Sequence, residues 1–404
     1  MTMSHRKLPR PLHLLGAALT ATALLLAACG GGGGDGATGS AGTGATTSTL
    51  TEGPITGFGS IIVNGVRFDD SAAAVSDDDD AASGRDRLKL GMQVEVESES
   101  VSDDGSGRKA RAARVRFGSE IVGPVQGAPD VANGRLTVLG QTVEVSAATV
   151  FAQSGGLAAL HAGDVLEVHA QYDSASAAYR ATRIELRGSV DAFRLRGAVS
   201  SLTASTFRIG GATIDYVALS PQLPATALAD GQRVRVRLAP TQTASGVWNA
   251  LAVRSGQRGV DDYAEASLHG TITAFSSAAQ FSVDGIPVDA SSAVFPDGRD
   301  ALAVGVEVEV EGPVVAGVLM ARKVALEDER HGAATREVEL HGTTSGYDGQ
   351  RFVLRGLTVQ LTAATVFRGV SPADLARSDL RIELKGELAA DGVTLLASRI
   401  SRED

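Results

Sequence analysis

Apolar and polar residues alternate in short runs along most of the chain and predict β-strands. Residues 305–312 read GVEVEVEG and residues 91–97 read GMQVEVE. A period of two places successive side chains on opposite faces, so each such strand buries its valines and exposes its carboxylates. Asn64-Gly65, Asp284-Gly285 and Gly210-Gly211 stand between apolar pairs, as in tight hairpins.

The same order of strand and turn signals recurs five times. A glycine precedes the alternating strand in four of the copies, at Gly91, Gly163, Gly231 and Gly305. Such a glycine is typical of a turn or bulge with a positive φ. The predicted repeats are residues 53–117, 118–190, 191–260, 261–330 and 331–404. Five short strands per copy predict an all-β chain, a tandem array of about five small, five-stranded barrels like those that bind oligonucleotides or oligosaccharides (OB-like).

The shared pattern is Gly-x-Ile, Phe-x-Val-x-Gly-x-x-Val, Thr-x-Phe, Gly-x-x-Val-x-Val and Ala-x-x-Val. It resembles the tandem bacterial domain known as domain of unknown function 5666, over nearly all of residues 53–404 and best in repeats two, four and five. In repeat one an acidic insertion, residues 69–86, replaces the Ala-Thr-Val-Phe strand, and in repeat three a loop with Pro221 does so. The resemblance implies an exported or lipidated β-barrel repeat protein without an assigned activity, and it supplies no catalytic residues.

The N-terminus has the features of a bacterial lipoprotein signal. A basic start precedes an apolar run, residues 12–26, which is too short to cross a bilayer. The next residues, Leu26-Ala-Ala-Cys29, resemble the lipobox, in which the cysteine is lipidated before cleavage. We therefore expect a signal peptide over residues 1–28, a lipid on Cys29 and a Gly/Ser/Thr-rich tether over residues 29–52. The alternative is an ordinary signal peptide with an incidental cysteine.

Charge and cysteine content narrow the possible partners. Cleavage after residue 28 removes Arg6, Lys7 and Arg10 and no acid, which leaves 34 basic against 47 acidic residues and a net charge of −13. Such a surface disfavours nucleic acid, and a 4% aromatic content offers few platforms for stacking bases. Cys29 is the single cysteine, so no disulfide forms and thiol catalysis is excluded once it is acylated.

The densest acidic cluster, Asp77, Asp78, Asp79 and Asp80, is the weak candidate for a metal site. Calcium takes about six to eight oxygen ligands, but the glycine and closing glutamate of an EF-hand loop are missing. We interpret the cluster mainly as a solvated, flexible loop.

Other polar residues fit no known constellation. His269 and His341 hold equivalent positions before a strand glycine, but they belong to different repeats and have no zinc spacing, so we interpret them as ordinary strand or surface histidines. Ser106 and Lys109 match S-x-x-K within a polar loop. Trp248, the sole tryptophan, either stacks on a sugar or, more ordinarily, lies half-buried under a loop. The sequence therefore predicts no catalytic residue and no cofactor.

These features favour a non-catalytic protein, lipid-anchored in the cell envelope, that binds a partner or acts as a spacer. We expect it on the outer membrane, facing the periplasm or the cell surface, with an envelope protein or glycan as partner. The alternative is a glycan-binding lipoprotein that uses the barrel faces, which would need repeated exposed aromatic residues. A cryptic enzyme is the third hypothesis.

Overall fold

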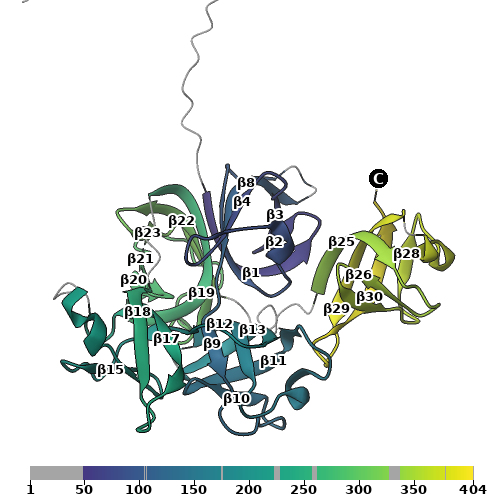
Figure 1. The fold of residues 1–404 in the computed structure, drawn as a ribbon. Helices are drawn as coiled ribbons and strands as arrows, with labels where there is room; N and C mark the ends of the chain where they lie inside the picture. The colour runs from purple at the N-terminus through teal and green to yellow at the C-terminus, as the bar shows by residue number, and fades with distance from the viewer. Residues whose placement is uncertain are drawn as a thin grey trace, which may run out of the picture. The chain divides into compact units, whose positions relative to one another are not determined.

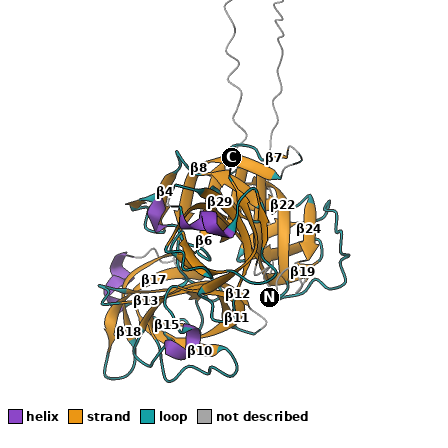
Figure 2. Cartoon of the chain, turned by 90° about the vertical axis from the view of Figure 1, so that its right-hand side faces the viewer, coloured by secondary structure: helices purple, strands orange, loops and turns teal. Residues whose placement is uncertain are grey.

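The computed structural model describes residues 49–403 apart from 104, 106, 174–175, 223–227, 257–261, 327–336 and 378. Over these ranges the regular structure is β-strand with four short 3-10 helices, and none of it is α-helix (Figure 2). None of the described helices has the length and apolar character needed to cross a membrane. The predicted signal peptide, Cys29 and most of the tether lie outside the described residues.

The strands fall into five consecutive modules (Figure 1). Module 1 contains β1 (Thr49–Phe58), β2 (Ile61–Val63), β3 (Val66–Asp69), β4 (Ala74–Asp77), β5 (Ala82–Ser83), η1 (Arg85–Arg87), β6 (Gln93–Ser98), β7 (Ser102–Asp103) and β8 (Arg108–Phe117). Module 2 contains β9 (Ile121–Pro124), β10 (Arg135–Val138), β11 (Gln141–Phe151), η2 (Gly156–Ala159), β12 (Val165–Asp173) and β13 (Ala178–Arg187). Module 3 contains β14 (Phe193–Ala198), β15 (Thr206–Ile209), β16 (Ala212–Asp215), η3 (Val217–Gln222), β17 (Arg233–Gln242) and β18 (Trp248–Ser255).

The last two modules follow the same plan. Module 4 contains β19 (Tyr263–Ser277), β20 (Gln280–Val283), β21 (Ile286–Asp289), β22 (Glu307–Val315), β23 (Val318–Met320) and β24 (Lys323–Leu326). Module 5 contains β25 (Glu337–Ser345), β26 (Arg351–Leu354), β27 (Leu357–Gln360), β28 (Val366–Arg368), η4 (Pro372–Ala376), β29 (Arg381–Leu388) and β30 (Thr394–Arg402).

Each module closes into a barrel by one pairing scheme. In module 5, β25 pairs with β26 and β26 with β27, both antiparallel; β27 runs parallel to β30, and β29 closes the ring by pairing with β30 and β25. In modules 2 and 3 the contact between the first two strands is a single bridge. The order 1-2-3-5-4-1 is that of a five-stranded OB-like barrel, so the predicted fold class is confirmed.

Alternation along the strands fills each barrel with its own side chains. Val308 and Val310 of β22 are fully buried, while Glu309 between them faces outward. Phe207, Phe281 and Phe352, at equivalent positions on the second strand of their modules, are buried. The barrel interiors are therefore packed cores rather than cavities.

The glycine before the fourth strand has one structural role throughout. Gly91, Gly163, Gly231 and Gly305 all have φ between 78° and 92°, a conformation that disfavours side chains. In each of the four modules its N–H donates to a carbonyl of the first strand or the residue after it, at 2.8–2.9 Å. This bond fixes where the loop rejoins the barrel and explains why the glycine recurs in the sequence.

Module 1 differs from the sequence-based prediction at two places. Strand β1 begins at Thr49, so the last four residues of the predicted tether are already strand. The Ala-Thr-Val-Phe strand is not replaced by the acidic insertion, because β4 runs parallel to β8 as β28 runs parallel to β30 in module 5. The acidic run begins at the end of this strand. In module 3 the expected loop contains η3.

The modules also pair with one another. Strand β1 runs parallel to β19 of module 4 along Thr49–Glu52, and parallel to β25 of module 5 at Gly57 and Phe58. Strand β9 pairs with β14, and modules 2 and 3 share one apolar core. The first strand of a module is thus the main site of contact between modules.

Candidate functional site: a charged junction between modules

The outer face of the first and fourth strands carries the charges that distinguish the modules. The residue before the first-strand glycine lies directly opposite a fourth-strand residue in each module: Glu52 and Glu95, Val122 and Glu167, Arg196 and Arg235, His269 and Glu309, His341 and Glu383. The fourth-strand residue is glutamate in four modules and arginine in module 3. Two arginines directly opposite each other repel and need a counter-ion.

The acidic loop of module 1 supplies that counter-ion. Asp78 is buried, and its Oδ2 lies 2.7 Å from Nη2 of Arg196 and 3.5 Å from Nη1 of Arg235. The Asp78 carbonyl also accepts a hydrogen bond from Arg235. Our interpretation of the cluster as a solvated loop is therefore wrong for Asp78, because two guanidinium groups outside its own module remove it from water.

The other three aspartates have separate roles. The Asp77 carboxylate accepts hydrogen bonds from the N–H groups of Asp79 and Ala81 at 2.9 Å, which holds the loop in a turn. Asp79 lies 3.1 Å from Arg235 and 3.2 Å from Arg254. Asp80 is 77% exposed and lies 3.4 Å from a guanidinium nitrogen of Arg116. These carboxylates bind arginines and backbone N–H groups, so the loop does not gather its oxygens around a calcium ion.

Glu120 of module 2 extends this set of ion pairs, because it contacts two arginines of module 3. Glu120, which precedes β9, lies 3.0 Å from Nη1 of Arg196 and 3.7 Å from Nη2 of Arg233. The Tyr179 hydroxyl donates to the carbonyl of Arg196 at 2.6 Å. Burial of the phenol, with Glu120 nearby, raises the pKa of Tyr179 and keeps it a donor. We call Asp78, Glu120, Arg196, Arg233 and Arg235 the charged junction.

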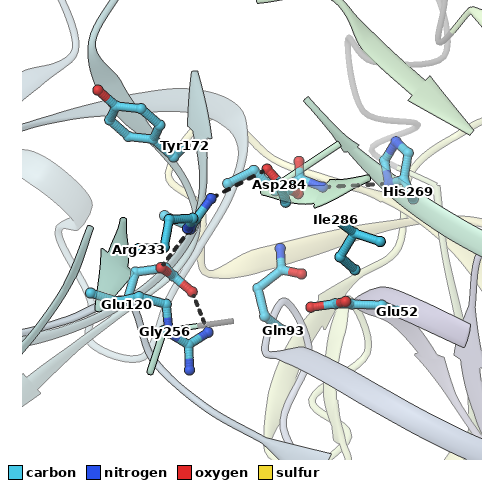
Figure 3. Close-up of a pocket in the computed structure, with 12 residues that line it drawn as sticks. Glu52, Gln93, Glu120, Tyr172, Arg233, Gly256, His269, Asp284 and Ile286 are labelled. Carbon is cyan, nitrogen blue, oxygen red and sulfur yellow. Dashed lines mark hydrogen bonds and ion pairs between the residues drawn. The ribbon is translucent and has the colours of Figure 1, made fainter. Parts of the chain in front are cut away.

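A small polar cavity adjoins the junction, and residues of four modules line it (Figure 3). Its volume is about 50 Å³. A single water needs roughly 10–15 Å³ by this measure, so the cavity has room for a few waters and none for an organic substrate. The lining residues are Glu52, Gln93, Glu120, Ala170, Gln171, Tyr172, Arg196, Arg233, Gly256, His269, Asp284 and Ile286.

Asp284 is a carboxyl group of the cavity with a strongly raised pKa. Burial, opposed by Arg233 and reinforced by Glu52 and Glu120, raises the pKa of Asp284 to about 7. Figure 3 shows Arg233 between Glu120 and Asp284, with the Arg233–Asp284 ion pair at the limit of contact, 4.0 Å. Such a carboxyl group takes up and releases a proton near neutral pH, which makes the junction sensitive to pH.

The other histidines outside module 5, and Ser106, lie in ordinary surroundings or outside the described residues. His161 is exposed, and His169 is fully buried with Nδ1 2.9 Å from the carbonyl of Gly118. Burial lowers the pKa of His169, so it is neutral. His269 Nδ1 lies 3.5 Å from the Gln171 amide. Ser106 and His331 fall outside the described residues.

The aromatic residues do not form a sugar-binding platform. Trp248 is 4% exposed and packs edge-on against Phe193, with ring centroids 5.5 Å apart. All eleven Phe, all five Tyr and the single Trp lie within the described residues, and each is buried or half-buried. Stacking on a sugar needs an accessible ring face, so the glycan-binding alternative loses its main physical support.

Glu120, Arg196 and Arg233 belong to no sequence motif, and the sequence marks Asp284 only as a hairpin residue. One signal was present: residues 233–237 read RVRVR where the other repeats have glutamate in the fourth strand. That reversal marks module 3 as different, although it does not say which acidic segment binds to it.

The family model described as Domain of unknown function (DUF5666) matches residues 52–107, 122–185, 269–325 and 341–401. These stretches correspond to modules 1, 2, 4 and 5. Module 3, with the arginine-bearing fourth strand, lies outside the matched residues. No curated protein matches the chain.

Proposed function

Because the chain belongs to the DUF5666 family, whose description assigns no activity, we propose a function on physical grounds: the protein is a non-catalytic, lipid-anchored scaffold of the cell envelope. In this role the barrels bind one another through charged faces and present their remaining surface to a partner. The observation that carries the proposal is the placement of Arg196 between Asp78 and Glu120, which come from two other modules.

The junction supports a structural role because its charged groups contact each other rather than an open site. Breaking a buried ion pair by removing one partner costs about 3–5 kcal/mol, so such a network fixes one arrangement of modules. The adjoining cavity, at about 50 Å³, accommodates water only.

The anchor is proposed from the sequence, in which Leu26-Ala-Ala-Cys29 follows an apolar run. Two or more acyl chains, at about 0.8 kcal/mol per buried CH₂, hold a protein stably at a membrane. A tether after Cys29 then carries module 1 and the barrels that follow. We expect the outer membrane because Gly30, rather than aspartate, follows the cysteine.

Cell fractionation tests the anchor. Cys29→Ser should move the protein from the membrane to the soluble fraction or leave its signal uncleaved, whereas Gly32→Ser, which keeps the cysteine, should leave it at the membrane. Unchanged membrane attachment of Cys29→Ser would contradict the anchor.

Cross-linking in native membranes, followed by mild-detergent purification and mass spectrometry, tests the binding role. A reproducible envelope protein would support it, and a recovered glycan would support the alternative role. Recovery of this chain alone would contradict a binding role and favour a spacer.

A further inference from the structure

Module 5 contains a second cluster of charged residues, away from the junction. Glu339 and His341 lie on β25 and Glu383 lies on β29. One ligand atom from each, an imidazole nitrogen or a carboxylate oxygen, lies within 4.8 Å of the other two. Two carboxylates and one imidazole form a ligand set that suits zinc and similar divalent transition metals.

The strands place these residues together for simple reasons. Glu339 and His341 are two residues apart on one strand, so both side chains leave the same face. His341 pairs directly with Glu383 across the antiparallel ladder. The three groups therefore belong to one outer face of one barrel, and their positions depend only on the pairing of β25 with β29.

His341 has the surroundings of a metal ligand. It is 9% exposed, and its Nε2 lies 2.8 Å from Oε1 of Glu339. Its Nδ1 lies 3.4 Å from Oε1 of Glu403. A metal-bound histidine ordinarily donates its second N–H to a carboxylate, which orients the ring and leaves the other nitrogen for the metal.

Two cations of module 5 hold the outer carboxylate oxygens. Lys385 lies 3.2 Å from Oε2 of Glu339, and Arg399 lies 3.3 Å from Oε1 of Glu383. Each carboxylate retains a second oxygen, and for Glu339 this is Oε1, the atom nearest His341.

A cation from module 1 contacts two of the three residues. Nη1 of Arg67, on β3, lies 2.9 Å from Nε2 of His341, and its Nη2 contacts Oε1 of Glu339. A guanidinium only donates, so the Arg67 contact needs the tautomer in which Nε2 carries a free electron pair, which is also the form that binds a metal. The contact of the same Nε2 with the Glu339 carboxylate needs the other tautomer, with hydrogen on Nε2. Arg67 thus contacts two of the three groups that would bind a metal ion.

We propose that Glu339, His341 and Glu383 form a binding site for one divalent transition metal ion of the zinc class, and that Arg67 closes this site when module 1 packs against module 5. Zinc bonds are about 2.0–2.2 Å long, so the ligand atoms must close in slightly around the ion. Calcium and magnesium do not fit, because they prefer oxygen ligands alone. A metal ion and Arg67 therefore compete for the same side chains. Metal binding weakens the Arg67 contact, and the Arg67 contact lowers the affinity for the metal by the same factor.

Calorimetric titration with ZnCl₂ tests the proposal on the full chain in detergent, purified with a histidine-free tag. Arg67→Gln should bind one Zn²⁺ about tenfold or more tightly than the wild type, because the competing cation is gone. His341→Gln in the Arg67→Gln background should abolish this binding. His161→Gln is the matched control, since His161 is exposed and lies 3.8 Å from one carboxylate, that of Asp164; it should change nothing.

Two results would overturn the site: equal affinity in Arg67→Gln and the wild type, or binding that survives His341→Gln. Arg67→Lys keeps a positive charge but not the forked contact, and it should give an intermediate affinity if Arg67→Gln does not fold. Cobalt(II) provides a second readout, because its visible absorption should show one nitrogen-containing site in Arg67→Gln and none after His341→Gln.

Discussion

Modules 3 and 5 share one fold but carry opposite chemistry on the same face. In module 3 the equivalent first- and fourth-strand positions hold Arg196 and Arg235, and in module 5 they hold His341 and Glu383. Module 1 contacts both faces, with Asp78 on the two arginines and Arg67 on His341 and Glu339. The face is therefore a common docking position, and its charge selects the segment that binds.

The charges also prevent the wrong match. Residues 193–255 contain seven arginines, two aspartates and no other charged residue, a net charge of +5. Arg67 on this face would meet only like charge, and Asp78 beside Glu339 would do the same. The comparison teaches that divergence of one repeat, rather than a new fold, gives the array a fixed arrangement.

Removing the counter-ion of module 3 should have the largest effect on stability. Asp78→Asn leaves Arg196 and Arg235 facing each other, and we expect a loss of about 3 kcal/mol in the free energy of unfolding, measured in urea. Asp80→Asn is the control, since this side chain is 77% exposed, and it should cost under about 0.5 kcal/mol. Equal losses in the two variants would contradict the role of Asp78.

A double variant sharpens this test. R235E restores the arrangement of the other modules, because it places a carboxylate opposite Arg196. D78N/R235E should therefore be more stable than D78N alone, although R235E by itself should be destabilising next to Asp78. Additive losses in the cycle would show that the two residues do not interact.

The cavity, where Asp284 of module 4 faces Arg233 of module 3, should respond to pH. The pKa of the Asp284 carboxyl is 3.8 in the unfolded chain and about 7 in the folded protein. Between these pH values the folded protein keeps a proton that the unfolded chain has lost, so stability falls as pH rises through this range. Asp284→Asn removes this loss of stability. The difference in free energy of unfolding between the variant and the wild type should therefore shift in favour of the variant by on the order of 1 kcal/mol from pH 5 to pH 8. Asparagine also suits the φ of 48° at this turn.

Thermal unfolding at both pH values measures the Asp284 effect. Asp289→Asn, on the adjoining strand, is the control. Hydrogen bonds from Ser291 lower the pKa of Asp289, so its contribution is already complete at pH 5 and should not change up to pH 8. A difference between Asp284→Asn and wild type that is the same at both pH values would contradict the raised pKa.

A charge pair within one module should matter least. Arg114 contacts both carboxylate oxygens of Glu97 at 2.7 and 2.8 Å, but the arginine side chain is 49% exposed. Glu97→Gln should cost at most about 0.5 kcal/mol in urea unfolding, and the cost should shrink at high salt. A loss as large as that of Asp78→Asn would mean that charges within modules matter as much as those between them.

The strands and turns of the barrels could be predicted from the sequence because they depend on residues close together in the chain. Alternation at residues 305–312 and the turn glycines such as Gly91 are set by neighbours in the chain, and the barrels followed from them. The burial of Asp78 was missed because its partners, Arg196 and Arg235, lie more than a hundred residues away. The spacing of two between Glu339 and His341 is visible in the sequence and places both side chains on one face. That Glu383 lies opposite His341 depends on the register of β25 and β29, which the sequence does not specify.

The position of β1 has a consequence for the order of folding. Its end at Gly57 and Phe58 pairs with Glu339 and Leu340, residues that are made much later in synthesis. Chains fold domain by domain from the N-terminus, and contacts between distant residues form late. Module 1 therefore emerges with a short strand edge, Gly57 and Phe58, that stays unpaired until module 5 is made, and a chain that stalls before module 5 exposes that edge to aggregation.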